Sequence, residues 1–308
     1  MTDTALPPVV EPVVAAKPQT PFQRVVSDFC ESRIAVFGLV LVAISVFIAL
    51  FAPLISPQNP FDIAGLDLME SKQPPGSVSG DGKITYWMGT DGQARDMMSA
   101  IFYGMRISLF VGAVSVVAAL LIGIAVGLVA AYAGGRIDAL LMRIVDIMLS
   151  FPAILVALIL LSVLGKGIDK VLIALILVQW AYFARAARSA ALVERNKEYV
   201  EAAACLALPA HRIVFRHMLP NCMPSLIVIA TITLARAIAL EATLSFLGVG
   251  VPVTQPSLGM LISNGFEFLM SGGYWISFFP GIALAIAIIG INLAGDHLRD
   301  VLNPRNLR

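Results

Sequence analysis

The chain has 308 residues, of which 58% are hydrophobic and only 13% are charged, and its net charge is +1. This leaves too little polar surface for an ordinary soluble domain, and the near-neutral charge gives no reason to expect a nucleic-acid-binding protein. The three cysteines, Cys30, Cys205 and Cys222, are widely spaced without a metal or redox motif, which argues against a disulfide framework.

The N-terminal region is expected to precede the membrane. Residues 1–20 are rich in Pro, Val and Ala and lack periodicity, so we expect a disordered tail, with 1–33 as a cytoplasmic N-terminal segment. The apolar run 34–55 is too long for the hydrophobic part of a signal peptide and predicts the first transmembrane helix. Residues 56–106, punctuated by prolines, predict an outer, periplasmic loop that contains an interfacial helix.

The rest of the chain predicts an all-α, polytopic membrane protein with about six transmembrane helices. Further apolar runs long enough to cross a hydrocarbon core of about 30 Å occur at 107–133, 139–164, 168–188, 223–248 and 276–295. The second span is rich in small residues, which suits close helix packing, and these include Gly112, Gly123 and Gly127. Pro152 predicts a kink in the third span. The transmembrane core is then 107–295, and 296–308 is a cytoplasmic C-terminal tail.

The distribution of positive charge predicts the orientation. With the N-terminus inside, most of the 21 Lys and Arg residues fall in inside segments, as the positive-inside rule requires. Both termini and the segment 194–221 are then cytoplasmic.

A polar, basic segment between the fourth and fifth spans, EYVEAAACLALPAHRIVFRHMLPN, predicts two short helices. Asn196 is suited to cap a first helix that begins near residue 197. Pro209 is compatible with the first turn of a second helix, and Pro220 is expected to end that helix. We predict an elbow at 207–209. Such an elbow suits docking in a groove of another protein, and a solvated loop or a helix on the lipid headgroups is the alternative.

Charged side chains near the spans allow several roles. Arg236 lies near the middle of the fifth span, where a charge costs about 2.5–3.5 kcal/mol on insertion scales, so it should face protein or water. Glu241 lies about 140° around the same helix, so the two are not expected to pair with each other. Both are candidates for lining a pathway or contacting another subunit, with a structural ion pair as the alternative. Arg143 and Asp146 are expected to pair on one helix face.

The segment EYVEAAACLALPAHRIVFRHMLPN resembles the EAA loop of ABC-importer membrane subunits. In that family the loop has the pattern Glu-Ala-Ala, three residues, Gly, and further on Leu-Pro. The matching positions here are Glu201, Ala202, Ala203, Ala207, Leu219 and Pro220, with Ala207 in the place of the glycine. The resemblance implies that this loop is the coupling helix that inserts into an ATPase subunit, and that Glu201 helps to hold it there. Arg216 and His217 face the same compartment, with lipid-phosphate or surface contact as the alternative. Alanine resists positive φ, so Ala207 affects the geometry of the elbow.

Three other stretches narrow the resemblance to the dipeptide, oligopeptide and nickel branch, and within it to the C-type permease. They are residues 32–39 (SRIAVFGL), residues 89–96 (GTDGQARD) and residues 241–248 (EATLSFLG). The likeness covers about residues 25–305 and implies the permease fold of an ABC type I importer. Within the second stretch, Asp91, Arg95 and Asp96 are candidates for docking a binding protein, and helix capping is the alternative.

The resemblance also implies the partners. They are a second homologous permease that forms a hetero-dimer with this chain, two ATPase subunits that bind ATP and Mg, and a periplasmic or lipid-anchored solute-binding protein, all at a bacterial inner membrane. The chain has no phosphate-binding loop of the Gly-x-x-x-x-Gly-Lys-Ser/Thr kind, so we expect neither catalysis nor a cofactor in it. The implied cargo is a di- or oligopeptide.

Other cargoes and other classes of protein remain open. A nickel chelate, glutathione or another small peptide-like solute is the alternative cargo. An ion-coupled secondary transporter is the alternative class, for which broken helices or paired acids at mid-depth are typical. An intramembrane enzyme is disfavoured because no histidine lies in the core of any predicted span.

Overall fold

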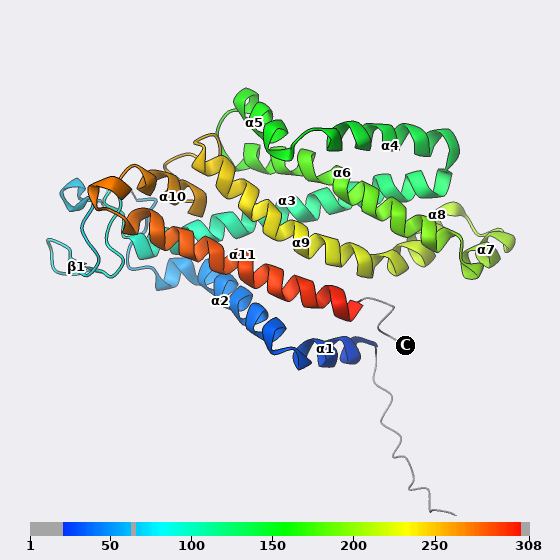
Figure 1. Cartoon of the computed structure of the whole chain (residues 1–308), viewed down its shortest axis with the longest axis horizontal. Coiled ribbons are helices and arrows are strands. Elements are labelled where there is room, and N and C mark those ends of the chain that lie inside the picture. The colour runs from blue at the N-terminus through cyan, green and yellow to red at the C-terminus, as the bar shows by residue number, and fades with distance from the viewer. Residues whose placement is uncertain (1–20, 63–65, 303–308) are drawn as a thin grey trace, which may run out of the picture.

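The computed structural model describes residues 21–62 and 66–302, and these residues form an elongated helical bundle (Figure 1). The predicted disordered tail over 1–20 lies outside the described residues. The elements in chain order are α1 (Pro21–Glu31), α2 (Arg33–Ile55), η2 (Leu68–Glu70), β1 (Ser77–Val78), β2 (Thr85–Tyr86), α3 (Met97–Ala133), α4 (Gly135–Ser150), α5 (Ala153–Leu164), α6 (Ile168–Arg195), α7 (Glu198–Cys205), α8 (Ala210–Arg212), η3 (Ile213–Met218), α9 (Leu219–Phe246), α10 (Leu258–Phe266), η4 (Leu269–Ser271) and α11 (Trp275–Leu302).

The predicted all-α fold with about six spans is confirmed. Within the described residues, five helices are long and apolar enough to cross a membrane, and the bent pair α4–α5 makes a sixth if it counts as one span. The predicted boundaries were too short in three places, since α3 begins at Met97, α6 continues to Arg195 and α11 continues to Leu302. Apolar runs end where charges begin, whereas a helix continues as long as its caps and packing support it. Parts of the predicted outer loop and C-terminal tail are therefore helical.

The third predicted span is two helices rather than one kinked helix. α4 and α5 meet at an angle of 87°. Phe151 has an extended backbone (φ −98°, ψ 142°), and Pro152 occupies the cap position of α5. The ring of a proline disfavours the helical conformation in the residue before it, which explains the break at this point. α4 lies along α6, and the chain changes direction sharply before α5 (Figure 1).

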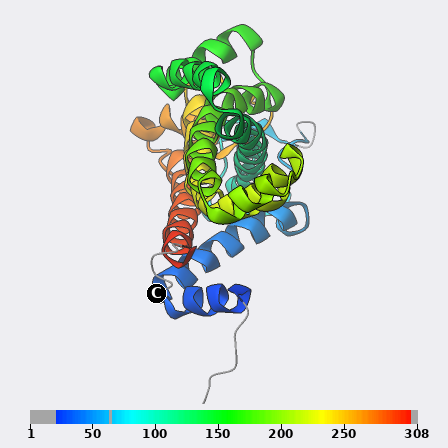
Figure 2. The ribbon, with the colours of Figure 1, turned by 90° about the vertical axis from the view of Figure 1, so that its right-hand side faces the viewer.

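α3 lies at the centre of the bundle. In the end-on view of Figure 2, α4 and α5 lie on one side of α3, and α1 and α2 lie on the other. The backbones of α3 and α6 approach closely: a Cβ added at Gly123 would lie 2.3 Å from Cβ of Phe183, and one at Gly127 would lie 2.6 Å from the carbonyl oxygen of Ala184. The predicted role of these small residues in close packing is confirmed.

Two ion pairs attach α4 to α6. Arg188 donates to the two carboxylate oxygens of Asp138 at 2.5 and 2.6 Å, and Arg185 donates to Asp146 at 2.5 Å. The predicted pair between Arg143 and Asp146 is wrong, because Asp146 forms its ion pair with Arg185 on α6. Arg143 is exposed and forms no ion pair within the described part of the chain.

A helix that the sequence did not predict precedes the first span. α1 contacts the far end of α11: the rings of Phe29 and His297 meet edge to face with centroids 5.4 Å apart. Nε2 of His297 also lies 3.2 Å from the carbonyl oxygen of Asp28. The segment predicted as an N-terminal tail is thus helical over Pro21–Glu31 and contacts the C-terminal helix through Asp28 and Phe29.

The predicted outer loop folds into a small cap at the end of the bundle opposite α7. β1 and β2 form an antiparallel hairpin that pairs Ser77 with Tyr86, in place of the expected interfacial helix. The carboxylate of Glu70 accepts hydrogen bonds from the Gly80 N–H at 2.5 Å and from the Tyr86 hydroxyl. Thr90 Oγ1 donates to the carbonyl of Glu70 at 2.6 Å, which holds the hairpin beside the start of α3. We call this the hairpin end.

Candidate functional site

The segment α7–α8–η3, which we call the elbow, projects at the end of the bundle opposite the hairpin (Figure 1). The chain reverses direction at Ala207, whose φ of 54° lies in the left-handed region. Leu208 N–H donates to the carbonyl of Ala203 at 3.2 Å, which closes the turn, and Pro209 occupies the cap position of α8. The predicted bend at 207–209 is confirmed, and an alanine adopts the conformation that glycine adopts most easily.

Two predicted helix ends near the elbow were wrong. Asn196 ends α6 instead of capping α7, and the cap position of α7 belongs to Lys197. Pro220 does not end the second helix, because the helical path continues from Ala210 to Phe246. η3 is a π-helix, in which the Leu219 N–H donates to the carbonyl of residue 214. η3 ends directly before α9, and Pro220 is the second residue of α9.

A buried carboxylate anchors the elbow to the bundle. Glu194, at the end of α6, accepts hydrogen bonds from Lys197 Nζ at 2.6 Å and from the Tyr199 hydroxyl at 2.5 Å. Asn221 Nδ2 donates to the Tyr199 oxygen at 3.2 Å and to the carbonyl of His217 at 2.7 Å. Burial and the hydrogen bond to Glu194 raise the pKa of Tyr199 to about 12, so the phenol remains a donor at neutral pH. This network joins α6, α7 and α9, and sequence patterns did not predict it because Glu194, Lys197, Tyr199 and Asn221 form no recognisable motif.

The outer face of the elbow combines apolar and charged side chains. Leu206 is 75% exposed and Phe215 is 65% exposed, so the elbow presents large apolar side chains at the end of the bundle. Its inner face is buried against α3, α6 and α9 through Val200, Ala203, Ile213 and Met218. Most of the residues predicted for coupling are exposed, namely Glu201, Ala202, Ala207, Arg216 and Pro220. His217 and Leu219 are half-buried, and Ala203 is buried. Large exposed apolar side chains together with exposed charges on a projecting segment are suited to docking another protein.

Replacing Ala207 with glycine is expected to stabilise the chain by about 1 kcal/mol, because a left-handed backbone costs a residue with a Cβ about 1–2 kcal/mol. The measurement is thermal unfolding of the purified protein in detergent. Ala204→Gly is the matched control: this residue is exposed inside α7, so glycine there should destabilise by about 0.5–1 kcal/mol. A lower melting temperature for Ala207→Gly would contradict the left-handed turn.

Glu241 is an internal link between helices. It is 0% exposed, and its carboxylate accepts hydrogen bonds from the hydroxyls of Ser108 on α3 and Ser245 on α9, each at 2.8 Å. The predicted role in a pathway or an intersubunit contact does not fit this position, because no part of the side chain reaches the surface of the chain. Arg236 takes no part in this group, as its different angle around α9 predicted.

Arg236 is exposed on α9 and forms no ion pair within the described residues. It lines a cavity of about 110 Å³ together with three polar side chains, Gln179, Tyr182 and Thr233. The structure therefore retains two of the predicted roles for Arg236, namely lining a pathway and contacting another subunit. Gln179 was not singled out from the sequence, because a lone Gln in an apolar run carries no motif.

Asp91, Arg95 and Asp96 are each 1% exposed. Nε of Arg95 donates to Asp91 at 2.7 Å, and Asp96 caps α3 by accepting from the N–H and hydroxyl of Ser99 at 2.8 and 2.6 Å. The predicted docking of a binding protein by these side chains does not fit, because burial removes them from the surface. The alternative of helix capping applies to Asp96.

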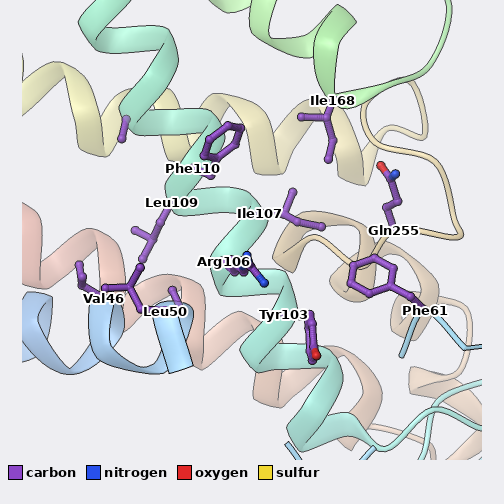
Figure 3. A pocket seen from close by; sticks show the side chains of 12 residues that line it. Val46, Leu50, Phe61, Tyr103, Arg106, Ile107, Leu109, Phe110, Ile168 and Gln255 are labelled. Atoms are coloured by element: carbon purple, nitrogen blue, oxygen red, sulfur yellow. The ribbon is translucent and has the colours of Figure 1, made fainter. Parts of the chain in front are cut away.

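A second, larger cavity of about 610 Å³ lies between α2 and α3 (Figure 3). Its lining is mainly apolar, and the polar exceptions are Tyr103, Arg106 and Gln255. Sequence patterns did not predict it, since its walls come from α2, α3, α6 and two loops that are far apart in the chain. Its mainly apolar lining is suited to burying an apolar surface.

Two family models match the chain. Residues 119–308 match the binding-protein-dependent transport system inner membrane component, and residues 20–75 match the N-terminal TM domain of oligopeptide transport permease C.

Individual relatives agree with the family match. The oligopeptide transport system permease protein OppC of Bacillus subtilis is 36% identical, over 90% of this chain and 87% of its own length. The di/tripeptide transport system permease protein DppC of Pseudomonas aeruginosa is 35% identical, over 93% of each chain. A putative peptide transport system permease protein of Brucella suis is 40% identical, over 87% of this chain and 86% of its own.

The fold also occurs in a solved transporter. A chain of the MetNI methionine ABC transporter, in an inward facing conformation, superposes with a TM-score of 0.55. The match covers 67% of this chain and 98% of that chain at 22% sequence identity, and thus supports the architecture alone.

Proposed function

The chain belongs to the family of binding-protein-dependent transport system inner membrane components, and on that premise we propose that its cargo is a di- or oligopeptide imported at the expense of ATP. As a permease of an ABC importer, it forms part of the path across the membrane. The chain itself performs no chemistry in this proposal. ATP and Mg are held by two ATPase subunits, and the free energy of hydrolysis reaches this chain as movement.

The elbow is the observation that carries the proposal. Leu206 and Phe215 present exposed apolar side chains and Glu201 presents an exposed carboxylate, all on the elbow at one end of the bundle. The Glu194 network fixes this surface to the ends of α6 and α9. A subunit that docks on the elbow and moves it therefore displaces both helices. Glu201, Arg216 and His217 are assigned to this contact.

The orientation and the other partners follow from that assignment. The elbow end faces the cytoplasm, where ATP is available, and the hairpin end faces outward, where a solute-binding protein delivers the cargo. A second, homologous permease completes the pathway as a hetero-dimer with this chain. The charge bias of the sequence supports the same orientation.

Peptides are favoured as the cargo by the relatives. The three proteins compared above are named as oligopeptide, di/tripeptide and putative peptide permeases. Nickel chelates, glutathione and other small peptide-like solutes are the competing cargoes.

Reconstitution tests the proposal. The chain, its second permease and its ATPase subunits are placed in liposomes with ATP inside, and the binding protein and radiolabelled dialanine or tetra-alanine are added outside. We expect accumulation that requires hydrolysable ATP and stops with vanadate. Accumulation of peptide by this chain alone, under an ion gradient and without ATP, would instead identify a secondary transporter.

A further inference from the structure

A buried polar side chain in the middle of α6 lacks partners. Gln179 is 5% exposed, and among the described residues neither its side-chain oxygen nor its side-chain nitrogen has a hydrogen-bond partner. Both atoms are therefore free to meet a donor or an acceptor that enters from outside the chain. Inside a membrane-spanning bundle such an unpaired amide is unfavourable unless something occupies the space beside it.

The space beside Gln179 is the cavity of about 110 Å³ that Arg236 also lines. The two residues come from different helices, α6 and α9, and the cavity also touches Ala153, the first residue of α5. The cavity therefore lies beside the bend of 87° between α4 and α5.

The lining of this cavity is suited to an anion. It contains the Arg236 guanidinium, the Gln179 amide and the Tyr182 hydroxyl, and none of its lining residues is acidic. The Thr233 hydroxyl also lines it but already donates to the carbonyl of Ile229 at 2.7 Å. Arg236 has no ion pair within the described chain, so its charge is available. A guanidinium presents two parallel N–H donors that match the two oxygens of a carboxylate, and the amide of Gln179 offers a further donor.

The cavity has room for a carboxylate group. One water needs about 10–15 Å³ of such space, so a volume of about 110 Å³ holds a carboxylate together with several ordered waters. Arg236 and Tyr182 are themselves exposed, so the rest of a bound molecule can lie on their exposed side.

We infer that Arg236 and Gln179 bind the terminal carboxylate of the peptide as it crosses the membrane. The inference rests on the proposed function and names the part of the cargo that this chain recognises. A C-terminal carboxylate is common to all unmodified peptides, so a site for it is compatible with cargo of varied sequence. The site would hold the carboxylate by two hydrogen bonds from Arg236 and one from Gln179. Because the cavity is shallow, the peptide can also be released from it, and transport requires this release.

The test uses the complete reconstituted complex with radiolabelled dialanine. Arg236→Gln and Gln179→Leu are each expected to lower the initial rate of ATP-driven uptake, by about tenfold for the former, which removes a charge-assisted pair. Arg236→Lys should recover part of the rate. Arg143→Gln is the matched control, because it also removes an exposed, unpaired arginine from a helix and should leave uptake unchanged. ATP hydrolysis without peptide should be the same in all variants.

Three outcomes overturn the inference. They are uptake by Arg236→Gln within twofold of the unmodified complex, equal losses in Arg236→Gln and Arg143→Gln, and loss of the second permease from purified Arg236→Gln complex, which would make Arg236 an intersubunit contact. Absence of uptake by the unmodified complex would overturn the proposed function itself.

A photo-crosslink gives a readout that is independent of rate. Tyr182, which is exposed beside the cavity, is replaced with p-benzoylphenylalanine, and the complex is irradiated during dialanine uptake. A dialanine adduct is expected at this position and should disappear when Arg236→Gln is added. Uptake without any adduct would contradict the site.

Discussion

Replacing Glu201 with lysine is expected to lower ATP-driven uptake by at least about tenfold and to release the ATPase subunits from the purified complex, because a reversed charge at an interface costs several kcal/mol. The chain itself should stay folded. Glu201 is exposed in the first turn of α7, and its only expected role there is with the helix dipole, about 0.3–1 kcal/mol. Co-purification and uptake in liposomes measure the two effects.

Glu198→Lys is the matched control for this result. Glu198 is exposed in the same turn of α7 and interacts with the same dipole. If the carboxylates act only on the helix, the two variants should behave alike. Retention of the ATPase by Glu201→Lys, or an equal loss in both variants, would count against a specific contact at Glu201.

The second large effect is expected from Gly123→Leu, which should prevent the chain from accumulating in a folded form. A Cβ at this position would lie 2.3 Å from Cβ of Phe183 and 2.7 Å from the backbone nitrogen of Ala184, so α3 and α6 would have to separate. These two helices form the centre of the bundle, and overpacking of this severity costs about 3 kcal/mol or more. The yield of monodisperse protein from membranes, measured by size-exclusion chromatography, reports the effect.

Gly281→Leu separates packing from the general effect of replacing a helical glycine. Gly281 lies in α11, and a Cβ there would meet no atom within 4 Å. It should accumulate at the level of the unmodified chain. Normal yield of Gly123→Leu would show that α3 and α6 are not packed as the structure has them.

Local signals explain which parts of the fold could be predicted from the sequence. The glycines of the second span, Pro152 and Pro209 each act on their immediate neighbours, so a close helix contact, a break and a turn were expected at the correct places. The size of the bend at Pro152 was not predicted, because the angle between α4 and α5 depends on how both helices pack on α6. The π-helix before Pro220 was not expected either, because neither the apolar spacing nor the position of the proline distinguishes a π-turn from an α-turn.

The charged residues show the same limit. One of the two partners of Glu241 is Ser108, which is 133 residues away, and the partner of Asp146 is Arg185 on another helix. Spacing along one helix suggested Arg143 for Asp146, since sequence distance is the only distance available before folding. Asp91 was expected on the surface because charged residues in loops usually are, whereas the hairpin end folds over it.

Only part of the candidate site could be predicted from the sequence. Glu201 and Ala207 were recognised through a motif that occupies consecutive or nearby positions. Sequence analysis did not single out Glu194, Tyr199 or Gln179, because their importance comes from their neighbours and surroundings in the folded chain. Leu206 and Phe215 were not singled out from the sequence, and their exposure became visible only in the folded chain.

The central claim is that the elbow contacts a nucleotide-driven subunit, and the native cysteines allow this to be measured directly. Cys205 on α7 and Cys30 on α1 are exposed, and Cys222 is buried. A benzophenone maleimide is attached to Cys205 in a Cys30→Ser chain, or to Cys30 in a Cys205→Ser chain, and the assembled complex is irradiated. The account predicts a crosslink from Cys205 to an ATPase subunit and none from Cys30. A labelled Cys205 that captures no ATPase subunit in a complex active in transport would contradict it.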